Sequence, residues 1–392
     1  MEHANEDPPL NPAGKRKIAR PPMLTLARCP SLNFHITEKP YKIEEESFGG
    51  VMWSVASRRG RRRTNREDMF AILPFVEHLH GSKALPISVF AVFDGHGGQK
   101  VAQYASQRLP QLFLRKYENT CDVERALEWA FIQTDKEISA GNAEPSEDSL
   151  SAVPVTLTRA CGTTATVVSL VGDQFTVAHV GDSRAVLSNL DGTVQRLFED
   201  HKPGRRDEME RIESAGGLVV EVSGTFRVNG VLAVSRAIGD PELKQFIIPR
   251  PDIFRFSLSG HEEFLVLASD GLWDNISDEE CMEYVRKIIS SEPADDSLEE
   301  EAAKLLVQTA WDRGTNDDIS VIVVNLLKYA SLWEKKQEEG DAAVEEEMLG
   351  VNTEKISSTC VDENQNPIEL EMVTPVAALP LETPRVRKPS PW

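Results

Sequence analysis

The chain has 392 residues, 40% of them hydrophobic and 27% charged, so it is long enough to bury a sizeable core in one large domain or several smaller ones. Its formal net charge of -20 argues against nucleic acid as the main partner, because contacts to a phosphate backbone need a concentrated positive surface. No apolar run is long enough for a transmembrane helix, and the five scattered cysteines, without a CxxC pair, indicate neither a zinc site nor a disulfide framework. We expect a protein of the cytoplasm, the nucleus or both, without a secretory signal and without a place in a membrane.

Both ends of the chain have the composition of disordered segments. Residues 1–48 are rich in proline and polar side chains and contain a basic cluster, Lys15-Arg16-Lys17, which is either a nuclear address or a chance feature of a flexible tail. Residues 331–392 are acidic and then proline-containing, with sites such as Thr374-Pro375 for proline-directed phosphorylation. The tails either bind regulators and accept phosphate or only keep the protein in solution.

The ordered domain is expected at residues 49–330. It opens with strands at 51–55 and 69–73, where apolar and β-branched residues alternate. Between these strands lies a basic run, residues 58–63. This run is either a solvated loop or a grip for a phosphate group beside a metal site.

Helical spacing of apolar residues appears after a third predicted strand, the apolar run that ends at Phe93. It predicts one helix over residues 99–117, with Pro110 as a break or kink, and a second helix over 123–139. Residues 140–158, with glycine, proline and serine, predict a mobile loop.

Short runs of β-branched residues dominate the rest of the domain. We place strands at residues 161–168, 175–180, 185–187, 218–221, 231–234, 264–269 and 319–324. Helical patterns, two of them with capping boxes, are placed at residues 205–215, 277–289 and from 297 onward. The predicted fold class is therefore α+β, with a β-sandwich core that has helices on both sides.

One nine-residue stretch, Phe90 to Gly98, carries the clearest chemical signal. Its apolar strand ends in Asp94, followed by Gly95, His96 and two further glycines. Asp94 offers hard oxygen ligands for Mg²⁺ or Mn²⁺, and a histidine can donate a proton near neutral pH. A plain Asp-Gly turn explains the stretch equally well when it is taken alone.

The same pattern recurs along the chain. Asp182 and Asp270 each follow a predicted strand, Asp317 lies just before another, and the pair Glu67-Asp68 directly precedes a further one. The repetition indicates that these carboxylates converge at one edge of the β core. Such a group needs cations, because like charges a few ångströms apart raise each other's pKa. Oxygen ligands without cysteine select Mg²⁺ or Mn²⁺ over Zn²⁺.

In these motifs the chain resembles the type 2C metal-dependent protein serine/threonine phosphatases, the PPM-type family. The resemblance covers residues 50 to 328 and rests on ordered motifs at residues 63–68, 93–98, 162–165, 181–184, 200–203, 234–240, 268–274 and 317–321. Each motif is weak alone, but their common order excludes chance.

The resemblance implies two antiparallel sheets flanked by α-helices, with a binuclear metal cleft at one edge and a flap at residues 200 to 235. Two ions, Mg²⁺ or Mn²⁺, and a weaker third would be bound. The residues that match the family's metal ligands are Glu67, Asp68, Asp94, Gly95 through its carbonyl, Asp270 and Asp317, with Asp182 and Asp274 for the third ion. Arg63 matches the arginine that holds the substrate phosphate, and His96 matches the proposed general acid.

The implied activity is hydrolysis of phosphoserine and phosphothreonine in phosphoprotein substrates. A metal-bridging hydroxide would attack phosphorus, without a phosphoenzyme, and a monomer is expected. Two alternatives stay open: an inactive adaptor with the phosphatase fold, and a hydrolase of small phosphoesters.

Two departures from the family pattern stand out. Asp318 follows Asp317 where the family usually has asparagine, and this extra charge either alters metal affinity or turns outward harmlessly. Val222 occupies the place of a tryptophan found in hormone-regulated plant members, which argues against regulation of that type.

Overall fold

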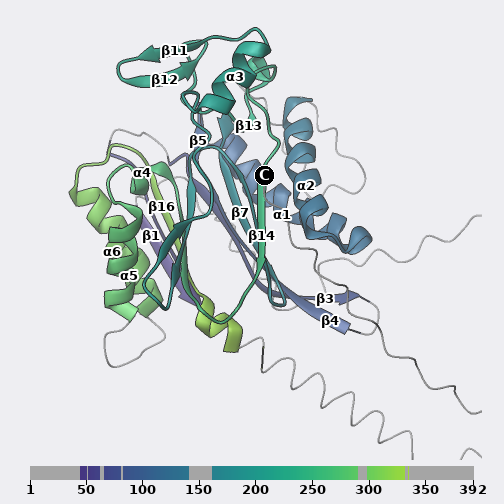
Figure 1. Ribbon diagram of the computed structural model, residues 1–392, viewed down its shortest axis with the longest axis vertical. Helices are drawn as coiled ribbons and strands as arrows, with labels where there is room; N and C mark the ends of the chain where they lie inside the picture. The colour runs from purple at the N-terminus through teal and green to yellow at the C-terminus, as the bar shows by residue number, and fades with distance from the viewer. Residues whose placement is uncertain are drawn as a thin grey trace, which may run out of the picture. The chain divides into compact units, whose positions relative to one another are not determined.

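The computed structural model describes residues 45–50, 52–61, 66–80, 83–140, 161–289, 298–331 and 334 (Figure 1). Arg63, the predicted loop at 140–158 apart from its first residue, and nearly all of the two predicted tails lie outside these residues.

Two antiparallel sheets form the centre of the fold. The six-stranded sheet has the order β1 (Glu45–Gly50), β2 (Trp53–Arg58), β16 (Ile319–Asn325), β15 (Glu262–Ala268), β9 (Arg184–Asn189) and β10 (Val194–Arg196). The five-stranded sheet has the order β14 (Asp252–Ser257), β8 (Gln174–Val180), β7 (Ala165–Val171), β4 (Lys83–Phe93) and β3 (Met69–His80). The predicted sandwich of antiparallel sheets is confirmed.

Side-chain alternation along the strands places the cores. In β4, Phe90 and Val92 are buried in the core between the two sheets, whereas Ala91 and Phe93 face the opposite side of the sheet. Strand β4 is therefore apolar on both faces, which is why it reads as a continuous apolar run in the sequence.

Helices cover the outer face of each sheet, and Figure 1 shows the two pairs on opposite sides of the sandwich. Helices α1 (Lys100–Thr120) and α2 (Val123–Ser139) pack on the five-stranded sheet, and α5 (Asp278–Ile289) and α6 (Leu298–Asp312) pack on the six-stranded sheet. None of the described helices is both long and apolar enough to cross a membrane.

A break at Pro110 and disorder up to residue 48 were wrongly predicted. Helix α1 continues past Pro110, which is buried inside it, so the helix does not break there. The first strand, β1, begins at Glu45, inside the segment predicted to be disordered. Strand β1 is held by backbone pairing with β2 rather than by an apolar pattern of its own, so periodicity could not reveal it.

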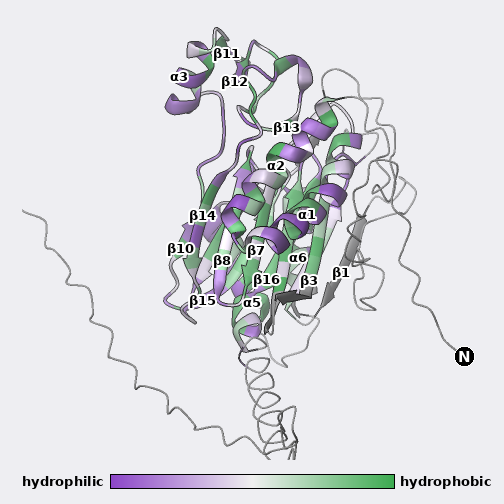
Figure 2. Cartoon of the chain, turned by 90° about the vertical axis from the view of Figure 1, so that its right-hand side faces the viewer, coloured by the Kyte–Doolittle hydropathy of each residue, from purple (hydrophilic) through white to green (hydrophobic). Residues whose placement is uncertain are grey.

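The segment predicted as a flap forms a small unit of its own, visible at one end of the sandwich in Figure 1 and in Figure 2. It contains α3 (Arg206–Ser214) and the hairpin of β11 (Val219–Val222) and β12 (Thr225–Val228) around a separate apolar cluster. The strand predicted at 231–234 is absent from these described residues, apart from a single bridge at Leu232. A second tight turn, with left-handed backbone at Asn229 and Gly230, ends the pairing early.

Three very short strands form a third sheet beside the ends of the larger ones. They are β13 (Ile238–Gly239), β6 (Gly162–Thr163) and β5 (Gly95–His96), in that order. Helix α4 (Asp270–Trp273) begins where β15 ends, and a 3-10 turn, η2 (Pro241–Leu243), follows β13.

Candidate active site

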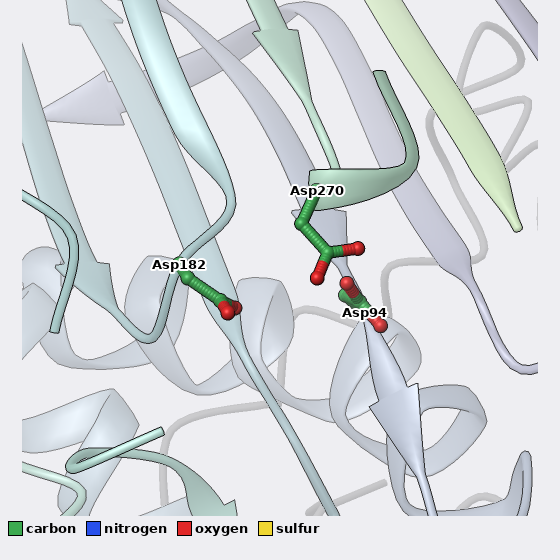
Figure 3. A group of neighbouring side chains, drawn as sticks. All are labelled: Asp94, Asp182 and Asp270. Atoms are coloured by element: carbon green, nitrogen blue, oxygen red, sulfur yellow. The ribbon is translucent and has the colours of Figure 1, made fainter. Parts of the chain in front are cut away.

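Three carboxylates converge beside the ends of the central strands. Asp94 directly follows β4, Asp182 lies just before β9, and Asp270 begins α4 after β15. Each offers an oxygen, and these oxygens all lie within 4.8 Å of one another. Figure 3 shows the three side chains pointing into a common space.

Antiparallel register explains why residues so distant in sequence meet here. Ala268 of β15 pairs with Arg184 of β9 on one side and with Val321 of β16 on the other. Asp270 is therefore placed next to the segments that carry Asp182 and Asp317. Likewise, Met69 pairs with Phe93, which puts Glu67 and Asp68 beside Asp94.

The charges of this cluster oppose one another. Burial raises the pKa of Asp94 well above its ordinary value, and the charges of Asp270, Asp68, Asp182 and Asp317 raise it further. Burial, followed by the charges of Asp182 and Asp317, raises the pKa of Asp270 from 3.8 to about 8. A set of buried oxygen ligands that repel one another fits a hard divalent cation such as Mg²⁺ or Mn²⁺.

The raised pKa of Asp270 predicts a pH-dependent stability of the metal-free protein. Between about pH 4 and pH 8 the folded protein keeps a proton that the unfolded chain releases, so the free energy of unfolding should decrease as pH rises. Saturating Mg²⁺ should offset this loss, because the cation takes the place of the proton. Thermal melts from pH 5 to 8.5, in EDTA and in Mg²⁺, measure both effects.

Asp270→Asn is the matched control, and it should flatten the decrease in EDTA. A melting temperature in EDTA that stays constant or rises between pH 5 and 8 would contradict the prediction.

Backbone contacts hold Asp94 in place. Its N–H donates to Thr164 Oγ1 at 3.1 Å, and its carbonyl accepts from Thr163 Oγ1 at 3.0 Å and from the Thr164 N–H at 2.9 Å. Gly95 is buried, and a Cβ on it would lie 2.5 Å from the carbonyl oxygen of Glu67. Only glycine lets these two backbone segments approach so closely.

Asp68 is almost fully buried, with 1% of its surface exposed. Its carboxylate accepts a hydrogen bond from Ser269 Oγ at 2.7 Å, and burial followed by the charge of Asp318 raises its pKa. Asp68 is therefore tied to the residue that directly precedes Asp270.

Asp318 points into the protein rather than outward. Its Oδ1 accepts from the Gly60 N–H at 2.6 Å, and its Oδ2 accepts from the Glu67 N–H at 2.5 Å and, more distantly, from Asp68 at 3.4 Å. The segment before β3, which carries Glu67, is thus fastened to the segment before β16 by one carboxylate. Of the two alternatives for Asp318, the one in which its side chain turns outward is therefore wrong.

Asp318→Ala should destabilise the protein by about 2–4 kcal/mol, because it leaves the buried N–H of Gly60 and the half-buried N–H of Glu67 without acceptors. Asp318→Asn should cost less, because one acceptor oxygen remains. Urea unfolding measures the free energy of unfolding of both variants and shows which one is less stable. An alanine variant as stable as the asparagine variant would show that the acceptor oxygen kept by asparagine contributes nothing.

Asp182 has a cationic neighbour that the sequence did not reveal. The Lys202 ammonium bonds to the Asp182 carboxylate. Burial lowers the pKa of Lys202, but the charges of Asp182, Asp270 and Asp274 outweigh burial and raise it. Asp274, the other residue predicted for a third ion, lies near this group but is exposed.

His201 holds the backbone next to Asp182. Its Nδ1 accepts the Gly181 N–H at 3.2 Å, and its Nε2 lies 3.0 Å from an oxygen of Asp252. Lys202 and His201 both belong to the motif at residues 200–203, which could have drawn attention to them, but neither was predicted as a site residue.

Two arginines of the basic run pack on a helix. The guanidinium carbons of Arg58 and Arg61 lie 3.8 and 4.4 Å from the ring centre of Trp311 in α6. These two side chains are therefore not simply solvated. Arg63 lies outside the described residues, so its predicted contact with phosphate stays a prediction.

His96 bonds to Asp240, a residue that was not predicted as part of the site. Its Nε2 lies 2.8 Å from Asp240 Oδ1. The sequence did contain a signal, since Asp240 ends the motif at residues 234–240.

Comparison with known proteins agrees with this geometry. The protein-family description "Protein phosphatase 2C" matches residues 53–319. The chain is 42% identical over 241 residues to probable protein phosphatase 2C 45 of Oryza sativa subsp. japonica, covering 62% of this chain and 77% of that protein. It is 38% identical over 276 residues to probable protein phosphatase 2C 59 of Arabidopsis thaliana, covering 70% and 80%.

A solved structure has the same fold. The chain superposes on a structure described as a C. elegans sex determining protein with a TM-score of 0.61 and 25% identity, covering 73% of this chain and 67% of the other. The family match, together with the helix-flanked double sheet and the gathered carboxylates, identifies a phosphatase of the metal-dependent class. The chain belongs to the protein phosphatase 2C family, and it is a serine/threonine protein phosphatase.

Proposed function

We propose that this phosphatase hydrolyses phosphoserine and phosphothreonine in proteins with the help of two divalent cations, Mg²⁺ or Mn²⁺. The observation that carries the proposal is the convergence of Asp94, Asp182 and Asp270, whose oxygens lie within 4.8 Å of one another. Membership of a metal-dependent family makes cation binding the natural explanation for such a costly arrangement of charge.

The residues that would hold the two ions are Asp94, Asp270, Asp317, Glu67, Asp68 and the carbonyl of Gly95. Asp182 and Asp274 would add a weaker third position with Asp270. Cations bound there supply an activated water and neutralise charge that develops on the phosphoryl group. The described contacts of Asp318, Ser269 and Thr164 fix the backbone and side chains that present these ligands.

Two side chains would act on the substrate directly. Arg63 would bind the phosphate oxygens, because a guanidinium donates two parallel hydrogen bonds to them. His96 would donate a proton to the departing serine or threonine oxygen. In this proposal water attacks phosphorus directly, and no phosphoenzyme forms.

The two alternatives differ in what they require of the site. An adaptor would tolerate loss of the acidic cluster, yet every predicted carboxylate is present in the sequence. A hydrolase of small phosphoesters would use the same carboxylates, so only substrate choice separates it from a protein phosphatase.

A substrate comparison tests the proposal. The full chain is incubated with Mn²⁺ and equal concentrations of a phosphothreonine peptide, the matched phosphotyrosine peptide and glycerol phosphate. We expect release of phosphate from the phosphothreonine peptide well above the other two. Preference for glycerol phosphate would favour the small-phosphoester alternative, and a folded protein that hydrolyses none would favour the adaptor.

A further inference from the structure

The side chain of His96 is held by a buried carboxylate. His96 Nε2 lies 2.8 Å from Oδ1 and 2.9 Å from Oδ2 of Asp240. The Asp240 side chain is 3% exposed, whereas that of His96 is 23% exposed. An ionised carboxylate only accepts hydrogen bonds, so Nε2 must be the donor. Among the residues that the structure describes, none bonds the other ring nitrogen, Nδ1.

The third sheet builds this pair. In its three short strands, His96 pairs with Gly162, and Gly162 pairs with Gly239. A Cβ on Gly162 would lie 2.1 Å from Asp240 Oδ2 and 2.5 Å from His96 Nε2. The histidine and the aspartate therefore meet directly above the one residue in the middle strand that has no side chain.

The backbone around Asp240 is fixed from two sides. Asp240 has a left-handed conformation, with φ of 52°, which residues other than glycine seldom adopt. Its N–H donates to the Cys161 carbonyl at 2.8 Å, and the Gly239 N–H donates to buried Asp135 at 2.9 Å. These contacts hold the carboxylate in place independently of His96.

We propose that Asp240 is the positioning residue of His96, and that His96 presents Nδ1, not Nε2, to the substrate. The inference rests on the proposed function, because it specifies how the proton reaches the departing oxygen. As water oxygen forms its bond to phosphorus and releases one proton to solvent, the bond from phosphorus to the serine or threonine oxygen breaks and leaves its electron pair on that oxygen. The proton on Nδ1 moves to it and gives a hydroxyl. His96 stays bonded to Asp240 through Nε2–H, and solvent returns the proton to Nδ1.

Substrates with different leaving groups separate this role from a merely structural one. A serine or threonine alkoxide is a poor leaving group and needs a proton, whereas the nitrophenolate of p-nitrophenyl phosphate leaves without one. Asp240→Asn keeps the size of the side chain but removes its charge. We expect kcat for a phosphothreonine peptide to fall by about 10–100-fold, and kcat for p-nitrophenyl phosphate by less than about 3-fold.

Three further variants sharpen the test. His96→Gln should show the same selective loss, and the double variant should lose little more than either single one, because the two residues act as a unit. Gly162→Ala should also lower turnover of the phosphothreonine peptide more than that of p-nitrophenyl phosphate. Its Cβ would push His96 and Asp240 apart, although both residues remain. Glu137→Gln is the control: it removes a carboxylate bonded to Arg108 at 2.8 Å, between α1 and α2, and should leave both activities unchanged.

Spectroscopy gives a readout that does not depend on catalysis. In the Mg²⁺-loaded wild type, ¹⁵N spectra of labelled histidine should show a proton on His96 Nε2 that exchanges slowly with water. A slowly exchanging proton on Nδ1 instead would overturn the proposal, even if every variant fails to fold. Equal losses on both substrates, or no loss, in folded Asp240→Asn would also overturn it. A wild type that hydrolyses neither substrate with Mn²⁺ would contradict the proposed function instead.

Discussion

Asp94→Asn and Asp270→Asn should abolish catalysis and at the same time raise the melting temperature of the metal-free protein. Both carboxylates are desolvated and are repelled by the acids around them. Replacing one by a neutral amide removes part of that repulsion, so the metal-free fold gains stability. The same change removes an anionic ligand, and we expect turnover to fall by about 1,000-fold or more.

The distinctive result is that turnover falls while the melting temperature of the metal-free protein rises. Melting curves in EDTA and phosphopeptide turnover in Mn²⁺ measure the two quantities. Asp173→Asn, which removes an exposed carboxylate, is the matched control and should change neither. If both cluster variants melt below the wild type in EDTA, the carboxylates are not in the mutual conflict that their geometry implies.

Gly271→Ala should have the largest effect on stability of any single methyl group added to the site. A Cβ at this position would lie 1.9 Å from the carbonyl oxygen of Asp318 and 2.9 Å from its carbonyl carbon. Backbone atoms cannot rotate away as a side chain can, so α4 would have to move relative to the segment before β16. Overpacking of this kind costs roughly 1–3 kcal/mol or more.

Gly204→Ala is the matched control for this substitution. The atoms nearest its Cβ would be those of the Phe226 ring, a side chain that is 41% exposed and can move more easily than backbone. We expect it to stay within about 1 kcal/mol of the wild type in urea unfolding. Equal costs for the two variants would show that the approach of Gly271 to Asp318 is looser than the structure has it.

Local patterns predicted much of the fold. The helix predicted at residues 123–139 is α2, with the same bounds. Its apolar spacing and its N-cap at Asp122 are local signals, which do not depend on contacts with distant parts of the chain. The strands ending at Phe93 and Ala268 were predicted because fully buried strands are apolar throughout. Edge strands such as β1 and β14 lack that signal and were not predicted.

Part of the candidate site was also predicted, because a local pattern marks some of its residues. Asp94, Asp182 and Asp270 share a local pattern, an apolar strand beside an acid, and antiparallel pairing then brings them together. Lys202, Asp240 and the inward carboxylate of Asp318 have no such pattern, because their partners lie 20, 144 and 258 residues away in sequence. Only the register of the folded strands decides those contacts.

A combined titration with Mn²⁺ tests the central claim most directly. Binding of Mn²⁺ to the wild type and to Asp94→Asn is measured by calorimetry, and turnover of a phosphothreonine peptide is measured in the same samples. We predict no turnover in EDTA, turnover that rises with occupancy of the cation sites, and weaker binding with no turnover in the variant. Full turnover in EDTA, or a folded wild type that binds Mn²⁺ and hydrolyses nothing, would contradict the account.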